Sequence, residues 1–241
     1  MRYKTAPGRR IYAIGDLHGR ADLFALMLDR IAADNAARGK ALTQIVVLGD
    51  VVDRGPDSAG LVARLIRYTA ASKNFVVLRG NHEMTMEAVL SGQINEFALW
   101  LKMGGASTLA SFGLHGLETR TDRMAALRRA AKKVVPEHVL RWIRRLPLTH
   151  RSGDVLFVHA GIRPGVPLKR QSPEDLAWIR DEFLNCTAPH PCLIVHGHAE
   201  DEAGPQVHEN RIGVDTGAYR TGRLTALGIE GSDVWFLTAT G

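Results

Sequence analysis

Three short segments in the first third of the chain carry a glycine followed by a side chain that can bind a metal ion. They read GDLHG (15–19), GDVVDRG (49–55) and GNHE (80–83), and two later segments, HAG (159–161) and HGH (196–198), add histidines. Carboxylate, amide and imidazole ligands suit divalent cations such as Mn, Fe or Zn, whereas a structural zinc site would normally contain thiolates. The residue types therefore predict a metal site with mixed nitrogen and oxygen ligands.

The candidate ligands are too many for one ion that keeps an open position. They are Asp16, His18, Asp50, Asn81, His159 and either His196 or His198. Each could be explained locally, because Gly-Asp is common in turns and a single histidine is often only hydrogen-bonded. Turn chemistry does not account for five such strand ends in one chain, so we interpret the set as ligands of two ions that share one carboxylate.

The segments that precede these residues have the pattern of buried strands. Short runs rich in β-branched residues lie at 10–15, 44–49, 75–80, 155–159 and 193–196. Amphipathic helical patterns at 21–36, 58–71 and about 83–91 follow the first three runs. This alternation predicts parallel strands with right-handed crossovers, and ligands bind at the carboxyl ends of such strands. We therefore expect the candidate ligands to converge on one edge of a sheet.

The remainder of the chain predicts more strands and one helical region. Strand patterns recur at 212–214, 224–229 and 234–237, and the stretch at about 94–146 is mostly helical in pattern. With 241 residues, 45% hydrophobic content and no dividing linker, we interpret 1–241 as a single globular domain with a helical insertion or cap at about 94–146.

Cysteine content and hydropathy predict the compartment. Cys186 and Cys192 belong to no metal-binding motif, and no apolar run approaches the roughly 20 residues that cross a membrane. We therefore expect a cytoplasmic protein with no membrane partner.

The net charge of +6 is concentrated in one segment. Residues 120–145 hold nine Lys and Arg against two acids. The preferred interpretation is a solvated helix face, and the alternative is a docking surface for an acidic partner. The basic residues are not interleaved with aromatics, so a nucleic-acid partner is not expected.

The five segments, in this order, resemble the sequence blocks of metallophosphoesterases of the phosphoprotein phosphatase type. The similarity is greatest to small bacterial and phage serine/threonine protein phosphatases, and it covers about residues 11–220. It implies an α/β fold, the calcineurin-like αββα sandwich of mixed sheets. It also implies two divalent metal ions, with Mn as the first choice and Fe, Zn or Ni as alternatives.

The resemblance also implies a role for each ligand. Asp16, His18 and Asp50 would hold the first metal, whereas Asp50, Asn81, His159 and His198 would hold the second, with Asp50 as the bridge. His198 aligns with a family block that resembles Gly-His-Thr, although Ala199 stands at the Thr position. His196 remains the alternative to His198.

By the same resemblance, the reaction would be hydrolysis of a phosphoric monoester by in-line attack of a metal-bridging hydroxide. Arg54 and Arg180, with Asn81, would bind the phosphate of a phosphorylated protein or a small phosphoester. His82 would protonate the leaving alkoxide, and Asp53 would orient its imidazole.

Three further groups have expected places around this site. Arg79 is a candidate for a structural ion pair with a carboxylate beneath the site. The block at 215–218 would line the pocket, and Tyr219 would lie close to the substrate. The histidines outside these blocks, at 115, 138, 150, 190 and 208, are interpreted as surface or structural residues.

Two rival functions share parts of this pattern. Symmetrical bis(5'-nucleosyl)-tetraphosphatases have the same metal blocks, but they tend to lack the Asp of the DRG block and to carry GNHD. Asp53 and Glu83 therefore favour the protein phosphatase. The more distant rival is a non-catalytic scaffold, but such proteins usually lose a ligand or the His-Asp pair, and this chain has both.

Overall fold

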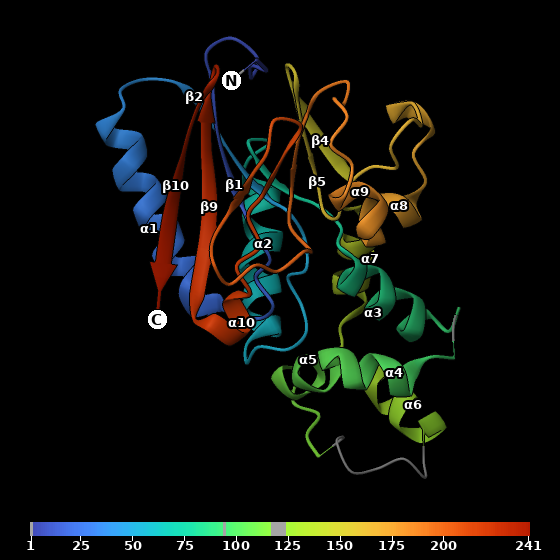
Figure 1. Ribbon diagram of the computed structural model, residues 1–241. Coiled ribbons are helices and arrows are strands. Elements are labelled where there is room, and N and C mark those ends of the chain that lie inside the picture. Colours follow the sequence, from blue (N-terminus) through green and yellow to red (C-terminus); the bar gives the residue numbers. More distant parts are fainter. Residues whose placement is uncertain (1, 94, 117–123) are drawn as a thin grey trace.

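Two five-stranded sheets packed against each other form the centre of the molecule (Figure 1). The computed structural model describes residues 2–93, 95–116 and 124–241. The first sheet has the order β10-β9-β1-β2-β3 and contains Arg9–Ile14 (β1), Leu42–Val47 (β2), Phe75–Val77 (β3), Arg223–Glu230 (β9) and Asp233–Thr240 (β10). The second has the order β4-β5-β6-β8-β7 and contains Thr149–Ser152 (β4), Val155–Val158 (β5), Leu193–His196 (β6), Gln206–Val207 (β7) and Arg211–Gly213 (β8).

Both sheets are mixed, with three parallel strands each and two further strands that pair antiparallel. Strands β1, β2 and β3 run parallel, as do β5, β6 and β8. Strands β9, β10, β4 and β7 pair antiparallel. The predicted strands are confirmed, whereas β4 and β7 were not predicted, because β4 reads THRS and β7 has two residues. Neither sequence has the apolar pattern of a strand.

The strand sequences are apolar on both faces because both faces of the first sheet are covered. Ile11 and Ala13 of β1 point into the core between the sheets. Tyr12 and Ile14 point the other way, into a core shared with the outer helices. Such two-sided burial is typical of parallel strands and explains their near-continuous hydrophobic runs.

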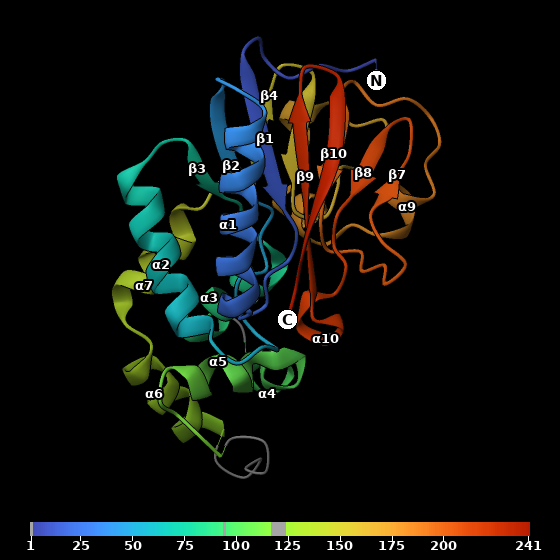
Figure 2. The same ribbon diagram turned by 90° about the vertical axis from the view of Figure 1, so that its left-hand side faces the viewer.

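Helices cover the outer faces, which completes the expected αββα arrangement (Figure 2). The helices after the first three strands are Ala21–Ala37 (α1), Ser58–Ala71 (α2) and Asn81–Ser91 (α3). Against the second sheet lie Pro173–Trp178 (α8) and Asp181–Leu184 (α9), after a 3-10 turn at Leu168–Arg170. Helix α10, Ala218–Thr221, precedes β9. No helix among the described residues is long and apolar enough to cross a bilayer.

Most of the predicted helical region lies at one end of the sandwich, and its last helix packs against α3 (Figure 1). Its described elements are Phe97–Trp100 (α4), a π-helical turn at Leu101–Gly105, Ala106–Ser111 (α5), Met124–Val134 (α6) and Glu137–Arg145 (α7). Part of the basic segment, Arg120 and Arg123 included, lies outside the described residues. Within the described part, Arg144 pairs with Glu87 and Glu137.

Candidate active site

The loops that follow β1, β2, β3, β5 and β6 meet, as expected, at the carboxyl ends of the parallel strands. Their backbones are unusual, because five non-glycine residues in the described chain have a positive φ. These residues are His18, Asp50, Asp53, Arg54 and His198, with φ between 41° and 72°. All five were predicted site residues. Left-handed backbone is strained at residues other than glycine, and such residues occur most often at functional sites.

The structure brings most candidate ligands together in two groups that share Asp50. One group contains His18, Asp50 and His82, and the other contains Asp50, His159 and His198. In each group the ligand atoms lie within 4.8 Å of one another. The Asp50 Oδ2 atom lies 3.7 Å from His18 Nε2 and 3.4 Å from His159 Nε2. A carboxylate between two histidine groups has the placement that a bridging ligand needs.

Hydrogen bonds set which nitrogen of each histidine faces the cluster. His18 Nδ1 lies 2.8 Å from the Val52 carbonyl, and His159 Nδ1 lies 3.0 Å from the Leu48 carbonyl. Each Nδ1 therefore carries a proton, and Nε2 points to Asp50. The buried Nε2 of His18 has no hydrogen-bond partner among the described residues. A lone pair buried without a donor fits a metal ion.

Asn81 completes the second group in a way that also fits a cation. Its Oδ1 lies 2.8 Å from His159 Nε2 and 3.1 Å from His198 Nδ1. With the amide reversed, the nitrogen would donate to Asp50 at 3.1 Å and to His159 at 2.8 Å. An amide oxygen that faces ring nitrogens is stable when a cation lies between them, so the donor set fits a divalent metal.

Two of the buried aspartates, Asp16 and Asp50, have pKa values that shift in opposite directions. Burial raises the pKa of Asp16 well above its usual range, and the Asp215 and Asp50 carboxylates add to the effect. Burial also opposes ionisation of Asp50, but His159 and His82 hold its pKa well below the usual value. Asp16 therefore lacks the positive charge that a nearby cation would supply.

Asp16 lies beside these groups and outside both of them. Its two carboxylate oxygens accept the backbone N–H of His198 at 3.3 and 3.2 Å. Close approach to backbone explains the neighbouring glycine, because a Cβ at Gly197 would lie 2.1 Å from Asp16 Oδ1. A Cβ at Gly80 would likewise lie 2.2 Å from Asp50 Oδ1. Larger residues at these positions would displace the carboxylates.

The structure separates the two histidines that competed for the last ligand position. His198 Nδ1 faces Asn81, whereas the His196 ring packs against Phe183 with its centroid 5.1 Å away. Burial lowers the pKa of His196 to about 4. Only His198 of the two lies in the ligand cluster, and it remains the proposed ligand.

His82, which lies in the first group with His18 and Asp50, also forms a buried pair with Asp53. His82 Nδ1 lies 2.7 Å from Asp53 Oδ2, and both side chains are almost fully buried. A carboxylate can only accept, so Nδ1 carries the proton and Nε2 faces the pocket, 3.9 Å from Asp50 Oδ2. Burial lowers the pKa of His82, but Asp50 and then Asp53 outweigh it, and the pKa is raised. The pair therefore has the geometry and charge of a proton donor.

The open part of the site is a cavity of about 460 Å³ above the ligand groups. Its walls include Arg54, Arg180, Trp178 and Met103. The Arg54 guanidinium lies 4.6 Å from the centre of the Tyr219 ring. Both predicted phosphate-binding arginines therefore reach the cavity, and Tyr219 supports one of them.

Glu200 is a pocket residue that the sequence analysis missed. Its carboxylate accepts from Arg54 Nη1 at 2.7 Å and from Arg220 Nη2 at 3.1 Å. It follows the GH block by two residues, but nothing in its spacing marks it as a partner of Arg54, 146 positions earlier in the chain.

Glu83 is a second residue whose role was missed. Its side chain is fully buried, and its two oxygens accept the backbone N–H groups of Gly80, Asp50, Val51 and Val52 at 2.8–3.1 Å. Burial raises its pKa to about 7. Glu83 thus holds the loop that carries Asp50. An Asp side chain at this position would be one carbon shorter. The Glu of GNHE therefore has a structural role here, because its length lets it reach these backbone groups.

Arg79 lies where the sequence placed it, in an ion pair beneath the site. Its Nη2 lies 3.2 Å from Glu87 Oε2, and Arg144 Nε donates to the other oxygen at 2.7 Å. Neither arginine lines the cavity described above. The Arg144–Glu87 pair ties α7 to α3.

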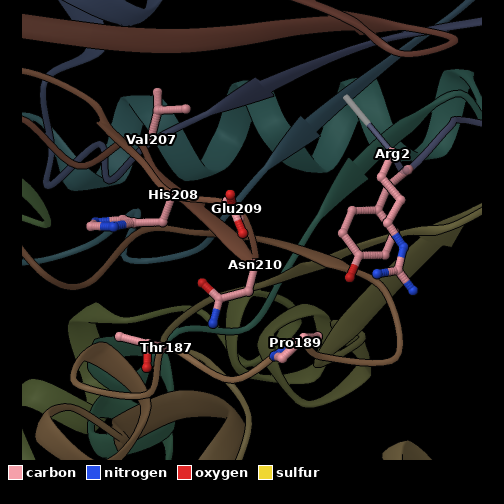
Figure 3. Close-up of a pocket in the computed structure, with 8 residues that line it drawn as sticks. Arg2, Thr187, Pro189, Val207, His208, Glu209 and Asn210 are labelled. Atoms are coloured by element: carbon pink, nitrogen blue, oxygen red, sulfur yellow. The ribbon is translucent and has the colours of Figure 1, made fainter.

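Another cavity, of about 710 Å³, lies away from these residues (Figure 3). Asn210 at its wall donates to the carbonyls of Cys186 and Ala188, and the Tyr3 hydroxyl donates to the His190 carbonyl. These polar groups are engaged by backbone. None of the candidate ligands lines this cavity, so the smaller one is the candidate active site.

Comparison with known proteins agrees with this geometry. The family model described as calcineurin-like phosphoesterase matches residues 9–224. The symmetrical bis(5'-nucleosyl)-tetraphosphatase of Nitrosococcus oceani is 30% identical over 157 residues, which cover 64% of this chain and 44% of that protein. The chain spans about half the length of this curated relative.

Solved structures share the fold at low sequence identity. A candidate diadenosine tetraphosphatase aligns with a TM-score of 0.65 and 21% identity, covering 98% of this chain and 99% of that chain. A protein serine/threonine phosphatase from Saccharomyces cerevisiae aligns with a TM-score of 0.59 and 16% identity, covering 98% and 81%. The family match runs through both sheets and all the ligand loops, and the chain belongs to the calcineurin-like phosphoesterases.

Proposed function

We propose that this chain hydrolyses a dinucleoside tetraphosphate symmetrically, into two nucleoside diphosphates. The observation that carries the proposal is the similarity to the symmetrical bis(5'-nucleosyl)-tetraphosphatase of Nitrosococcus oceani, which is 30% identical over 157 residues. This proposal differs from the protein phosphatase predicted from the sequence motifs. It places the substrate among small nucleotides.

The cavity contains groups suited to such a substrate. Arg54 and Arg180 supply two guanidinium groups for the phosphates, and Trp178 supplies an aromatic wall on which a base can stack. When bound, two divalent cations would supply Lewis acidity and activate a water molecule. We propose Asp16, His18 and Asp50 as holders of one ion, and Asp50, Asn81, His159 and His198 as holders of the other.

A second candidate function is hydrolysis of a phosphoserine or phosphothreonine ester in a protein. The buried His82–Asp53 pair, with its 2.7 Å contact, favours it. The alkoxide that leaves such an ester is a strong base and needs a proton, whereas a nucleoside diphosphate leaves without one. This observation keeps the protein phosphatase as an alternative.

A side-by-side assay separates the two functions. Chelator-treated protein, with and without added Mn²⁺, is given diadenosine tetraphosphate and a phosphoserine peptide, and the nucleotide products are identified. Mn²⁺-dependent release of ADP alone supports the proposal, whereas faster release of phosphate from the peptide supports the alternative. Release of ATP and AMP from the dinucleotide would contradict symmetrical cleavage.

The variant Asp53→Asn adds a control within the same experiment. It should lower peptide turnover about 10²-fold or more, because proton donation contributes that much to ester hydrolysis. It should leave dinucleotide turnover within about threefold of the wild type, since that leaving group needs no proton. Equal losses on both substrates would show that Asp53 acts on something other than the leaving group.

A further inference from the structure

Asp53 and Arg54 are consecutive residues that both have left-handed backbone. Their φ values are +72° and +69°. Residues other than glycine keep this backbone conformation only where the surrounding structure enforces it. The contacts that enforce it should therefore also set the position of the His82–Asp53 pair.

The helical region supplies these contacts through three residues, Trp100, Gly104 and Thr108, which we call the Asp53 clamp. Thr108 Oγ1 accepts the Asp53 backbone N–H at 2.8 Å, and its hydroxyl lies 2.7 Å from Asp53 Oδ1. Trp100 Nε1 donates to Asp53 Oδ2 at 3.0 Å. The Arg54 backbone N–H donates to the Gly104 carbonyl at 3.2 Å.

The π-helical turn allows the clamp to come this close. Gly104 has φ +119°, and a Cβ there would lie 2.5 Å from the Arg54 backbone nitrogen. A Cβ at Gly105 would lie 2.5 Å from the Trp100 ring. Trp100 and Thr108 are fully buried. The non-helical backbone at Gly104 therefore serves a contact with the site.

One carboxylate oxygen connects the clamp to the proton donor. Asp53 Oδ2 receives both His82 Nδ1, at 2.7 Å, and Trp100 Nε1, at 3.0 Å. Thr108 holds the other oxygen. With both oxygens fixed, the carboxylate plane is fixed, and so is the direction in which His82 Nε2 points.

We propose that Trp100 and Thr108 are positioning residues that align His82, through Asp53, for proton donation to the leaving group. The helical region is thus part of the catalytic apparatus. The inference rests on phosphoester hydrolysis at this site, and it applies to substrates whose leaving group needs a proton, as in the second candidate function.

Two aryl phosphates that differ only in leaving group test the proposal. Phenyl phosphate needs a proton on its leaving oxygen far more than p-nitrophenyl phosphate does. We expect Trp100→Phe and Thr108→Val to lower kcat on phenyl phosphate about tenfold, with kcat on p-nitrophenyl phosphate within about twofold of the wild type. Thr108→Ser, which keeps the hydroxyl, should restore turnover.

The matched control is Trp142→Phe. Like Trp100, the Trp142 indole donates a hydrogen bond to a side chain, but its acceptor is the Thr69 hydroxyl at 3.2 Å and not Asp53. It should change neither rate. Equal losses on the two substrates in the clamp variants, with normal metal content, would show a merely structural role and overturn the proposal.

A spectroscopic measurement decides the question without turnover. The His82 Nδ1 proton, shared with a buried carboxylate, should give a downfield proton resonance that Asp53→Asn removes. We expect Trp100→Phe to shift it and Trp142→Phe to leave it in place. The proposed function fails if diadenosine tetraphosphate is not cleaved to ADP, whereas the positioning role is overturned by an unchanged resonance in Trp100→Phe.

Discussion

The site has two halves, which satisfy their buried polar groups differently. In the acid half, the Asp53 carboxylate receives donors from His82, Trp100 and Thr108. In the ligand half, Asp16, Asp50, Asn81, His159 and His198 bring acceptor atoms to face one another. Backbone N–H groups donate to Asp16 and Asp50, but the facing acceptors keep lone pairs without a donor. Such burial is costly, so the protein alone organises the acid half, whereas the ligand half needs cations to complete it.

Removal of the metal ions is the strongest test of this difference. Chelation should abolish turnover of every substrate, and Mn²⁺ should restore it, because the ligand half then recovers its positive charge. Added Mn²⁺ should also raise the melting temperature of the chelated protein by mass action. Calorimetry with and without Mn²⁺ measures both the gain and its saturation. A melting temperature that does not change with Mn²⁺ would mean that the buried groups of the ligand half are stable without a bound ion.

Loss of His82 should affect the acid half alone. We expect His82→Asn to lower kcat on phenyl phosphate about 10²-fold or more, while p-nitrophenyl phosphate turnover falls much less. Mn²⁺ binding should stay, since the proposed ligands are untouched. Isothermal titration with Mn²⁺ checks this. A loss of metal affinity would show that His82 also contributes to metal binding, which would contradict the separation of the two halves. The test can fail, because His82 Nε2 lies only 3.9 Å from Asp50 Oδ2.

Two matched substitutions compare the stability of the halves in chelated protein. Asp53→Asn replaces one acceptor oxygen with an NH2 group, which then faces either the donors of His82 and Trp100 or the hydroxyl of Thr108. The free energy of unfolding should therefore fall by about 3 kcal/mol. Burial and the neighbouring Asp215 raise the pKa of Asp16 and so disfavour its charged form. Asp16→Asn removes this charge and should not destabilise the chelated protein. Urea unfolding in EDTA measures both values. Equal destabilisation would contradict the contrast between the halves.

Asp34 provides a small-effect reference outside the site. Its carboxylate accepts from Tyr12 at 2.6 Å, Trp235 at 2.9 Å and Arg38 at 3.0 Å. Asp34→Asn should cost about 1 kcal/mol at neutral pH and leave turnover unchanged. An effect on kcat would show that the hydrogen bonds of Asp34 influence the site from a distance.

The stability effect of Asp34→Asn should also depend on pH. Burial opposes ionisation of Asp34, but hydrogen bonds from Tyr12, Arg38 and Trp235 leave its pKa below the usual 3.8. Ionised Asp34 therefore stabilises the fold above the unfolded pKa, and this contribution is lost as the pH falls through the lower folded value. Unfolding curves of both proteins should converge in acid, and a constant difference would contradict the assignment.

The sequence was most informative where the determining pattern is local. Each parallel strand and the ligand that follows it lie within one short segment, so GDLHG and GNHE were enough to place Asp16 and Asn81 at a sheet edge. Helix α3 begins at Asn81, two residues before its amphipathic pattern, because the site residues occupy its first turn. That boundary is set by chemistry at the site and has no hydrophobic signal.

The missed residues depend on contacts between distant segments. Trp100 and Thr108 meet Asp53 from 47 and 55 positions away. In the sequence, Trp100 looks like an ordinary core residue and Thr108 like an ordinary helix residue. Glu83 was noted only for its identity, and its four backbone donors come from two loops that fold side by side. Such roles follow from tertiary packing and have no local pattern.

Glu200 has a consequence for how tightly phosphate is held. Because Arg54 already binds this carboxylate at 2.7 Å, an incoming phosphate exchanges one oxyanion for another on the same guanidinium. Glu200 keeps Arg220 as its partner during the exchange. The net attraction is therefore smaller than a bare guanidinium would give, and a cleaved phosphate faces a competitor at once. A site built this way favours rapid release of product over tight retention.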